Sequence, residues 1–144
     1  MTAFYELFAA VYDKLIGDET IKKLVYKPKT GKMTRDYAGV YDSVPDNAPF
    51  PYVVIGEPLE TDFGVKLKTT YETSLTIHTW SDKAGKTESF ALIEAVSNAL
   101  AASLFVENYR VEDMKVTTRR IFDDIDGVLR HGVYTVEYTL TKRG

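Results

Sequence analysis

The sequence predicts a single α+β domain, in which a mainly antiparallel sheet of four to five strands is covered on one face by two amphipathic helices. Three observations support this fold class. The 144 residues fit one ordinary domain, which we assign to residues 1–144. Apolar residues recur with helical spacing in two segments and with a spacing of two in the others. The strands follow one another through hairpin-type connections, which favour antiparallel pairing.

The first helix is predicted near the N-terminus, because apolar side chains recur there at intervals of three and four. These side chains are Phe4, Leu7, Phe8, Val11 and Leu15. Thr2 is a candidate cap for the start of the helix, and Gly17 is expected to end it. A second, short helix is expected after Asp18, whose carboxylate is placed to cap Ile21.

A basic segment follows the helices, although the whole chain has a net charge of −3. Its basic residues are Lys22, Lys23, Lys27, Lys29, Lys32 and Arg35, with no acid between Ile21 and Arg35. We interpret residues 26–39 as a loop or arm with a solvated basic surface. The alternative is a site for phosphate or an acidic partner.

The sheet is predicted to begin after this arm. A short strand is expected at Val40–Val44, followed by a proline-rich turn and by a buried strand at Phe50–Gly56. Pro51 cannot donate a ladder hydrogen bond, so we expect it at the start of that strand. Tyr71–Trp80 alternates between apolar and polar residues and predicts a half-buried strand. The segment 58–69 alternates again and is predicted to project as a hairpin.

The second long helix is predicted from near Ser81 or Lys86 to about Ser103. Its inner face is expected to carry Phe90, Ile93, Val96, Leu100 and Leu104. Two further strands, Val111–Phe122 and Val133–Leu140, are expected on either side of an Asp-Gly turn. The predicted core consists of Leu7, Val11, Val54, Leu75, Ile77, Phe90, Val96, Leu100 and Val136.

No motif for catalysis, cofactor binding or metal binding is found. The chain has no cysteine, which excludes disulfides and zinc ribbons. His78 and His131 lie on separate predicted strands without a local partner at ligand spacing, so we expect two ordinary strand-end histidines. The acidic turn before Gly127 fails as a calcium loop, because Phe122 and Val133 stand where acids are needed. Trp80 is expected to pack on a helix start, with an interface anchor as the alternative.

The N-terminus does not resemble a secretory signal, and no uncharged apolar stretch approaches the ~18 residues that span a bilayer. We therefore expect no association with membranes and synthesis in the cytoplasm.

The segment Tyr41–Glu57, YDSVPDNAPFPYVVIGE, resembles a characteristic stretch of the tail-completion (tail-terminator) proteins of long-tailed phages. Further pieces follow in the order of that family. Thr76–Ser81 is similar to its "hxWS" strand end, Gly85 to Glu88 to the polar start of its long helix, and Asp126–Gly127 with His131–Val133 to its final hairpin. The arm at 26–37 is longer than the family pattern.

This resemblance implies a structural, non-enzymatic role in the virion tail, at its head-proximal end. Such proteins form a ring, expected to be a homohexamer, on the finished tail tube, stop tube growth and meet the head–tail connector protein. The implied partners are therefore further copies of the chain, the tail tube protein and the connector, with DNA passing through the ring. We expect Phe63, Val65 and Leu67 of the projecting hairpin to contact a neighbouring subunit.

Three alternatives stay open from the sequence. A head-side connector or stopper protein also forms rings. A nucleic-acid-binding module would use the basic cluster Lys22–Arg35, although only Tyr26 is available there for base stacking. The third alternative is an enzyme without a recognisable motif.

Overall fold

The computed structural model describes residues 3–25, 39–62 and 69–143. Three helices lie in these ranges: α1 (Ala3–Gly17), α2 (Glu19–Leu24) and α3 (Thr87–Ala101). Five strands accompany them: β1 (Val40–Tyr41), β2 (Tyr52–Asp62), β3 (Thr70–Ser81), β4 (Tyr109–Asp123) and β5 (Arg130–Lys142).

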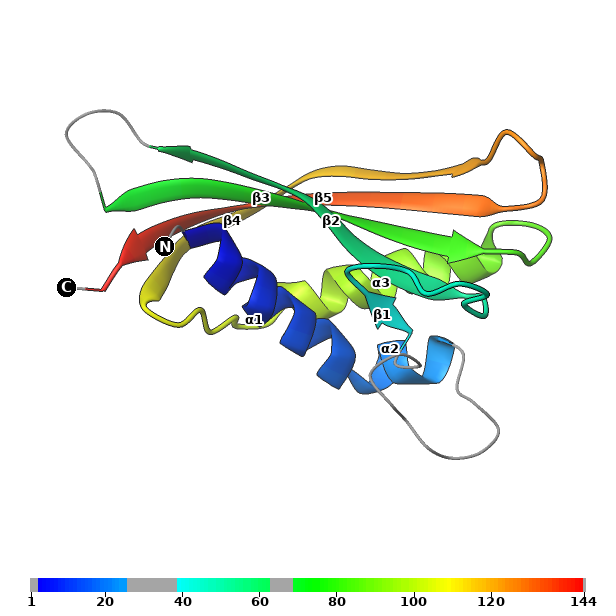
Figure 1. Ribbon diagram of the computed structural model, residues 1–144, viewed down its shortest axis with the longest axis horizontal. Helices are drawn as coiled ribbons and strands as arrows, with labels where there is room; N and C mark the ends of the chain where they lie inside the picture. The colour runs from blue at the N-terminus through cyan, green and yellow to red at the C-terminus, as the bar shows by residue number, and fades with distance from the viewer. Residues whose placement is uncertain (1–2, 26–38, 63–68, 144) are drawn as a thin grey trace.

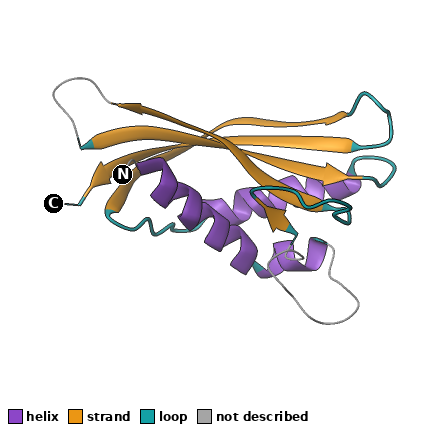
Figure 2. Ribbon diagram, in the orientation of Figure 1, coloured by secondary structure: helices purple, strands orange, loops and turns teal. Residues whose placement is uncertain are grey.

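The strands form one sheet in the order β1-β2-β3-β5-β4. β1 pairs with β2 in parallel, and the other pairings are antiparallel. The helices lie together against one face of the sheet, and the other face is left open (Figure 1; Figure 2). The predicted α+β class, with its mainly antiparallel sheet and helices on one face, is confirmed.

The N-terminal helices form for the reasons that the sequence indicates. In α1, Ala3, Leu7, Val11 and Leu15 are fully buried and recur every four residues, so they form one apolar stripe. α1 ends at Gly17, as expected. The carboxylate of Asp18 accepts a hydrogen bond from the Ile21 backbone N–H at 3.0 Å, which confirms the predicted cap of α2.

Two residues of the predicted core point away from it. Phe90 is 61% exposed on α3, because the buried stripe is centred on Val96 and Phe90 is rotated about 120° from that position. Val54 is only half-buried, since Val53 and Ile55 on either side of it face the helices. Both errors have one cause: an apolar run does not say which of its sides faces inward.

The first predicted strand is shorter than expected. Only Val40 and Tyr41 pair with β2, and residues 42–44 belong to the connection that follows. By contrast, β3 and β5 alternate as predicted, with Thr73, Leu75, Ile77 and Thr79 of β3 facing the helices. The facing side chains of β5 are Tyr134, Val136, Tyr138 and Leu140, all buried.

Gly132 in β5 allows the sheet to approach α3 closely. A Cβ atom at this position would collide with the hydroxyl group of Thr79 and would lie 3.1 Å from the Cδ1 atom of Ile93 on α3. A side chain here would therefore push the helix away from the strands.

Candidate functional site

The face of the sheet opposite the helices is polar along its middle. Threonines pair across β3 and β5 there, with the hydroxyl oxygens of Thr76 and Thr135 3.3 Å apart. Toward the end of β3 next to α3, aromatic and histidine side chains replace the threonines. This end of the open face is the first candidate site.

His78 and His131 meet at this end of the open face. The strand register pairs His131 with Trp80, which places His131 diagonally opposite His78. The Nδ1 atom of His78 lies 2.7 Å from the Nε2 atom of His131, so one ring donates and the other accepts. Both histidines lie on strands, as expected, but the sequence analysis missed their contact, because it depends on a register that the sequence does not give.

Trp80 stacks on His131 rather than on a helix start. The two ring centroids are 3.9 Å apart with an interplanar angle of 14°. Phe122 of β4 also contacts His131, and the centroids of these two rings are 4.8 Å apart. Because Trp80 alternates with the buried Thr79 and Ser81, its ring points to the face without helices.

Glu57 completes this cluster through an irregularity in β2. The register of β2 against β3 shifts between Gly56 and Leu59, and Glu57 has a positive φ of 46°. Such a bulge redirects a side chain. Here the carboxylate reaches the Nε2 atom of His78 at 2.9 Å.

The arrangement holds the rings in place but offers no catalytic constellation. The Glu57 carboxylate and the two imidazoles form a chain of hydrogen bonds, and within the described residues it does not continue to a serine or threonine hydroxyl. In the same part of the chain, no group of three or more His, Asp or Glu side chains is placed to hold a metal ion.

The histidine pair should make stability depend on pH. Burial, and then the charge of His78, lower the pKa of His131 below its ordinary value of about 6.5. Below about pH 6.5 the unfolded chain therefore binds more protons than the folded chain does. We expect the free energy of unfolding to be highest above this pH and to decrease as the pH falls toward the folded-state pKa.

Urea unfolding at a series of pH values between 5 and 8 measures this effect. His131→Phe keeps an aromatic ring against Trp80 but cannot titrate. The difference between the wild-type and variant free energies of unfolding at each pH therefore gives the contribution of His131 apart from that of the carboxylates. Parallel curves for the two proteins over this range would contradict the assignment.

A second candidate site is a groove between α3 and the edge strand β4, with a volume of about 650 Å³. The end of α3 and the loop after it form one wall, and β4 forms the other. Its apolar lining includes Leu100, Leu104, Val111, Met114 and Val116. Burial raises the pKa of Tyr138, so the hydroxyl group below the groove stays neutral.

Arginines surround this apolar lining. Arg110, Arg119 and Arg143 all border the groove. The guanidinium of Arg143 lies 5.5 Å from the ring centroid of Phe105, which is 72% exposed. The sequence did not indicate this groove, because its residues come from three separate segments and only the strand order brings them together.

The residues that the sequence analysis proposed for subunit contacts lie outside the described ranges. These are Phe63, Val65 and Leu67, between the ends of β2 and β3. Most of the basic cluster also lies outside, and only Lys22 and Lys23 are described, in the last turn of α2. In the described ranges, no helix combines the length and the hydropathy needed to cross a membrane.

Comparison with known proteins assigns the fold. The model of the family "Tail completion protein gp17" matches residues 9–141. The tail completion protein gp17 of Bacillus phage SPP1 is 28% identical over 102 residues, which cover 70% of this chain and 75% of that protein.

Two solved structures share the fold over nearly the whole chain. A chain in the virion of the native gene transfer agent particle superposes with a TM-score of 0.78 and 24% identity, covering 98% of this chain and 99% of its own. The structure of bacteriophage SPP1 gp17 gives a TM-score of 0.63 and 22% identity, covering 99% and 94%. Since the family model spans all but the two ends of the sequence, the chain belongs to the tail completion protein gp17 family of structural phage tail proteins.

Proposed function

We propose that six copies of this chain form a closed ring on the head-proximal end of the tail tube. The ring stops polymerisation of the tube and joins the finished tail to the head–tail connector protein. It assembles in the host cytoplasm, and DNA passes through it without sequence recognition. The role needs no catalytic step and no cofactor. Membership of the tail completion family supports this assignment.

The observation that carries the proposal is that one face of the sheet and one edge of β4 have no partner among the described residues. The helices cover one face of the sheet, and within the described residues β4 pairs along only one of its edges. β4 is 15 residues long, so its free edge presents a row of backbone donors and acceptors. Such an edge is suited to contact with a neighbouring copy.

Features of β4 also limit uncontrolled pairing. Its register against β5 shifts between Val111 and Asp113 and again between Val116 and Thr118. Charged side chains such as Lys115 and Arg120 are exposed along it. Bulges and charges keep an edge from adding strands indefinitely, so we infer a contact between different surface patches that closes by rotation.

One part of this proposal comes from the sequence alone, namely the hairpin predicted at residues 58–69. Phe63, Val65 and Leu67 alternate in a connection that is too long and too apolar for a simple solvent-facing turn. We propose that they contact the next subunit in the ring.

Val65→Glu tests that contact. We expect the monomer to unfold at the wild-type urea concentration, because the proposed contact of Val65 is with the next subunit, while rings and joined virions are lost. Sedimentation velocity and electron microscopy of lysates measure the two effects. Val65→Thr, which keeps the branched shape without the charge, is the matched control and should assemble. Normal virions from Val65→Glu would rule out the contact. A large loss of monomer stability would instead show that the predicted hairpin packs on the core of its own subunit.

A further inference from the structure

We propose that the turn between β4 and β5 of one subunit, with Ile125 at its tip, docks into the groove between α3 and β4 of the next subunit. This inference rests on the proposed ring and names the two patches that meet in it.

The tip is an apolar side chain held out in solvent between two acids. Ile125 is fully exposed, so docking it would remove its whole apolar side chain from water. Asp124 and Asp126 flank it in the sequence. Within the described residues, the carboxylate of Asp124 takes part in no ion pair.

Hydrogen bonds fix the shape of the turn. One carboxylate oxygen of Asp126 accepts from the backbone N–H groups of Val128 and Leu129, at 2.9 and 3.1 Å. The Asp124 N–H donates to the Leu129 carbonyl at 2.8 Å, and the Gly127 N–H donates to the Asp124 carbonyl at 2.9 Å. Gly127 takes the left-handed conformation at φ 70° that closes the turn.

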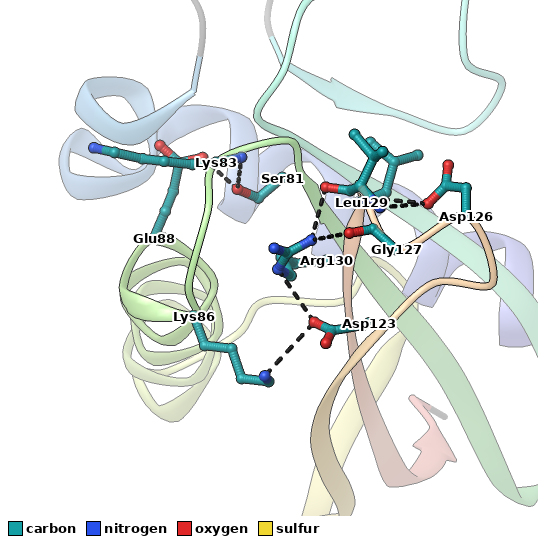
Figure 3. Close-up of polar contacts among 10 residues, drawn as sticks. Ser81, Lys83, Lys86, Glu88, Asp123, Asp126, Gly127, Leu129 and Arg130 are labelled. Carbon is teal, nitrogen blue, oxygen red and sulfur yellow. Dashed lines mark hydrogen bonds and ion pairs between the residues drawn. The ribbon is translucent and has the colours of Figure 1, made fainter.

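The turn is also tied to the start of α3. Asp123 forms ion pairs with Arg130 at 3.1 Å and with Lys86 at 3.6 Å, and the Arg130 side chain donates to the carbonyls of Gly127 and Val128 (Figure 3). These contacts reduce the conformational entropy that docking the tip would otherwise cost.

The groove is apolar like the tip but carries the opposite charge at its border. Among the described residues, neither Arg119 nor Arg143 has a carboxylate partner. Arg110 is paired with Glu112 at 2.6 Å. An apolar side chain between two carboxylates therefore matches this groove in both polarity and charge.

The groove extends along β4 from Arg119 to Arg110, away from the turn, and its end at Phe105, Arg110 and Arg143 lies at the other end of the strand, so the turn cannot reach that end within one chain. Arg110 pairs with Thr141 at one end of β4 and β5, whereas Asp123 pairs with Arg130 at the other. Thirteen residues at 3.3 Å each separate the two ends by roughly 40 Å. In Figure 1 the turn and the C-terminus accordingly lie at opposite ends of the sheet. A tip at one end and a groove at the other give a head-to-tail contact, which a ring requires.

Cross-linking of a double variant tests the contact directly. The natural chain has no cysteine, so Ile125→Cys with Phe105→Cys provides one thiol on each proposed patch. A short bismaleimide cross-linker, applied to purified tails, should give a covalent ladder that extends to the full ring. Each single variant, and the pair Ile125→Cys with Leu59→Cys, should give no ladder.

A charge exchange provides independent evidence that does not depend on a cross-linker. Asp124→Arg or Arg143→Glu alone should weaken subunit association about 10-fold or more, and the two together should recover most of the loss. Asp124 is suited to this test, because no hydrogen bond or ion pair among the described residues uses its carboxylate. Additive losses in the double variant would overturn the pairing.

The result also separates this inference from the proposed function. Rings and tails of normal length without a ladder would overturn the docking contact and leave the ring intact. Cross-linking of Ile125→Cys to the tube or connector protein would likewise overturn it, by assigning the tip to another partner. Absence of any ring on the tails would overturn the proposed function itself.

Discussion

Replacement of Leu100 by alanine is expected to lower the free energy of unfolding by about 2–5 kcal/mol. Leu100 is 2% exposed in the last turns of α3, where it belongs to the core between the helix and the sheet. Truncation removes its apolar contacts and leaves a cavity that the surrounding strands cannot fill without distortion. Because a domain of this size is stabilised by only about 5–15 kcal/mol, the loss is large.

Phe90→Ala on the same helix is the matched control. It removes a larger side chain, but one that is mostly in water, so we expect a change within about 0.5 kcal/mol. Urea unfolding of the two purified variants, followed by circular dichroism, gives both values. An equal loss for the two would mean that α3 presents a different face to the sheet.

The order and type of the elements could be predicted because each depends on nearby residues. Asp18 lies three residues before the backbone group that it caps, and Gly127 lies inside the turn that it closes. In β5 the alternation of Tyr134, Val136, Tyr138 and Leu140 gave the buried face correctly, since polar residues separate these side chains.

The errors occurred where local pattern does not determine orientation. Val53, Val54 and Ile55 are all apolar, so alternation cannot say which of them faces the helices. For α3, Phe90 and Ile93 suggested one face, whereas the small residues Ala95 and Ala99 pack inward because α3 lies close to the sheet. Helix position relative to the strands decides this, and it is a property of the whole domain.

The candidate sites depend on strand register even more strongly. His78 and His131 are 53 residues apart in the chain and become neighbours only because β3 pairs with β5. The groove requires β4 to be the edge strand next to β5. The acidic turn could be predicted from the sequence, but a docking role for its exposed Ile125 can be proposed only once the groove is known.

Loss of the chain is expected to produce tail tubes of uncontrolled length that do not join to heads. A tube grows by adding identical subunits, so without a terminating ring no contact distinguishes a finished end from a growing one. In lysates that carry an early stop codon in the gene, we expect overlong tubes beside DNA-filled heads without tails. Supply of the wild-type chain from a plasmid should restore uniform length.

The position of the ring is the most direct test of the account. It can be determined by electron microscopy of tails purified from a lysate in which heads cannot form, with mass spectrometry of the same fraction. We predict that these tails have uniform length, contain the chain, and carry a ring of six copies at the end that would meet the head. Tails of normal length with bare ends, together with recovery of the chain on heads from a tail-defective lysate, would contradict the account and assign the protein to the head side of the junction.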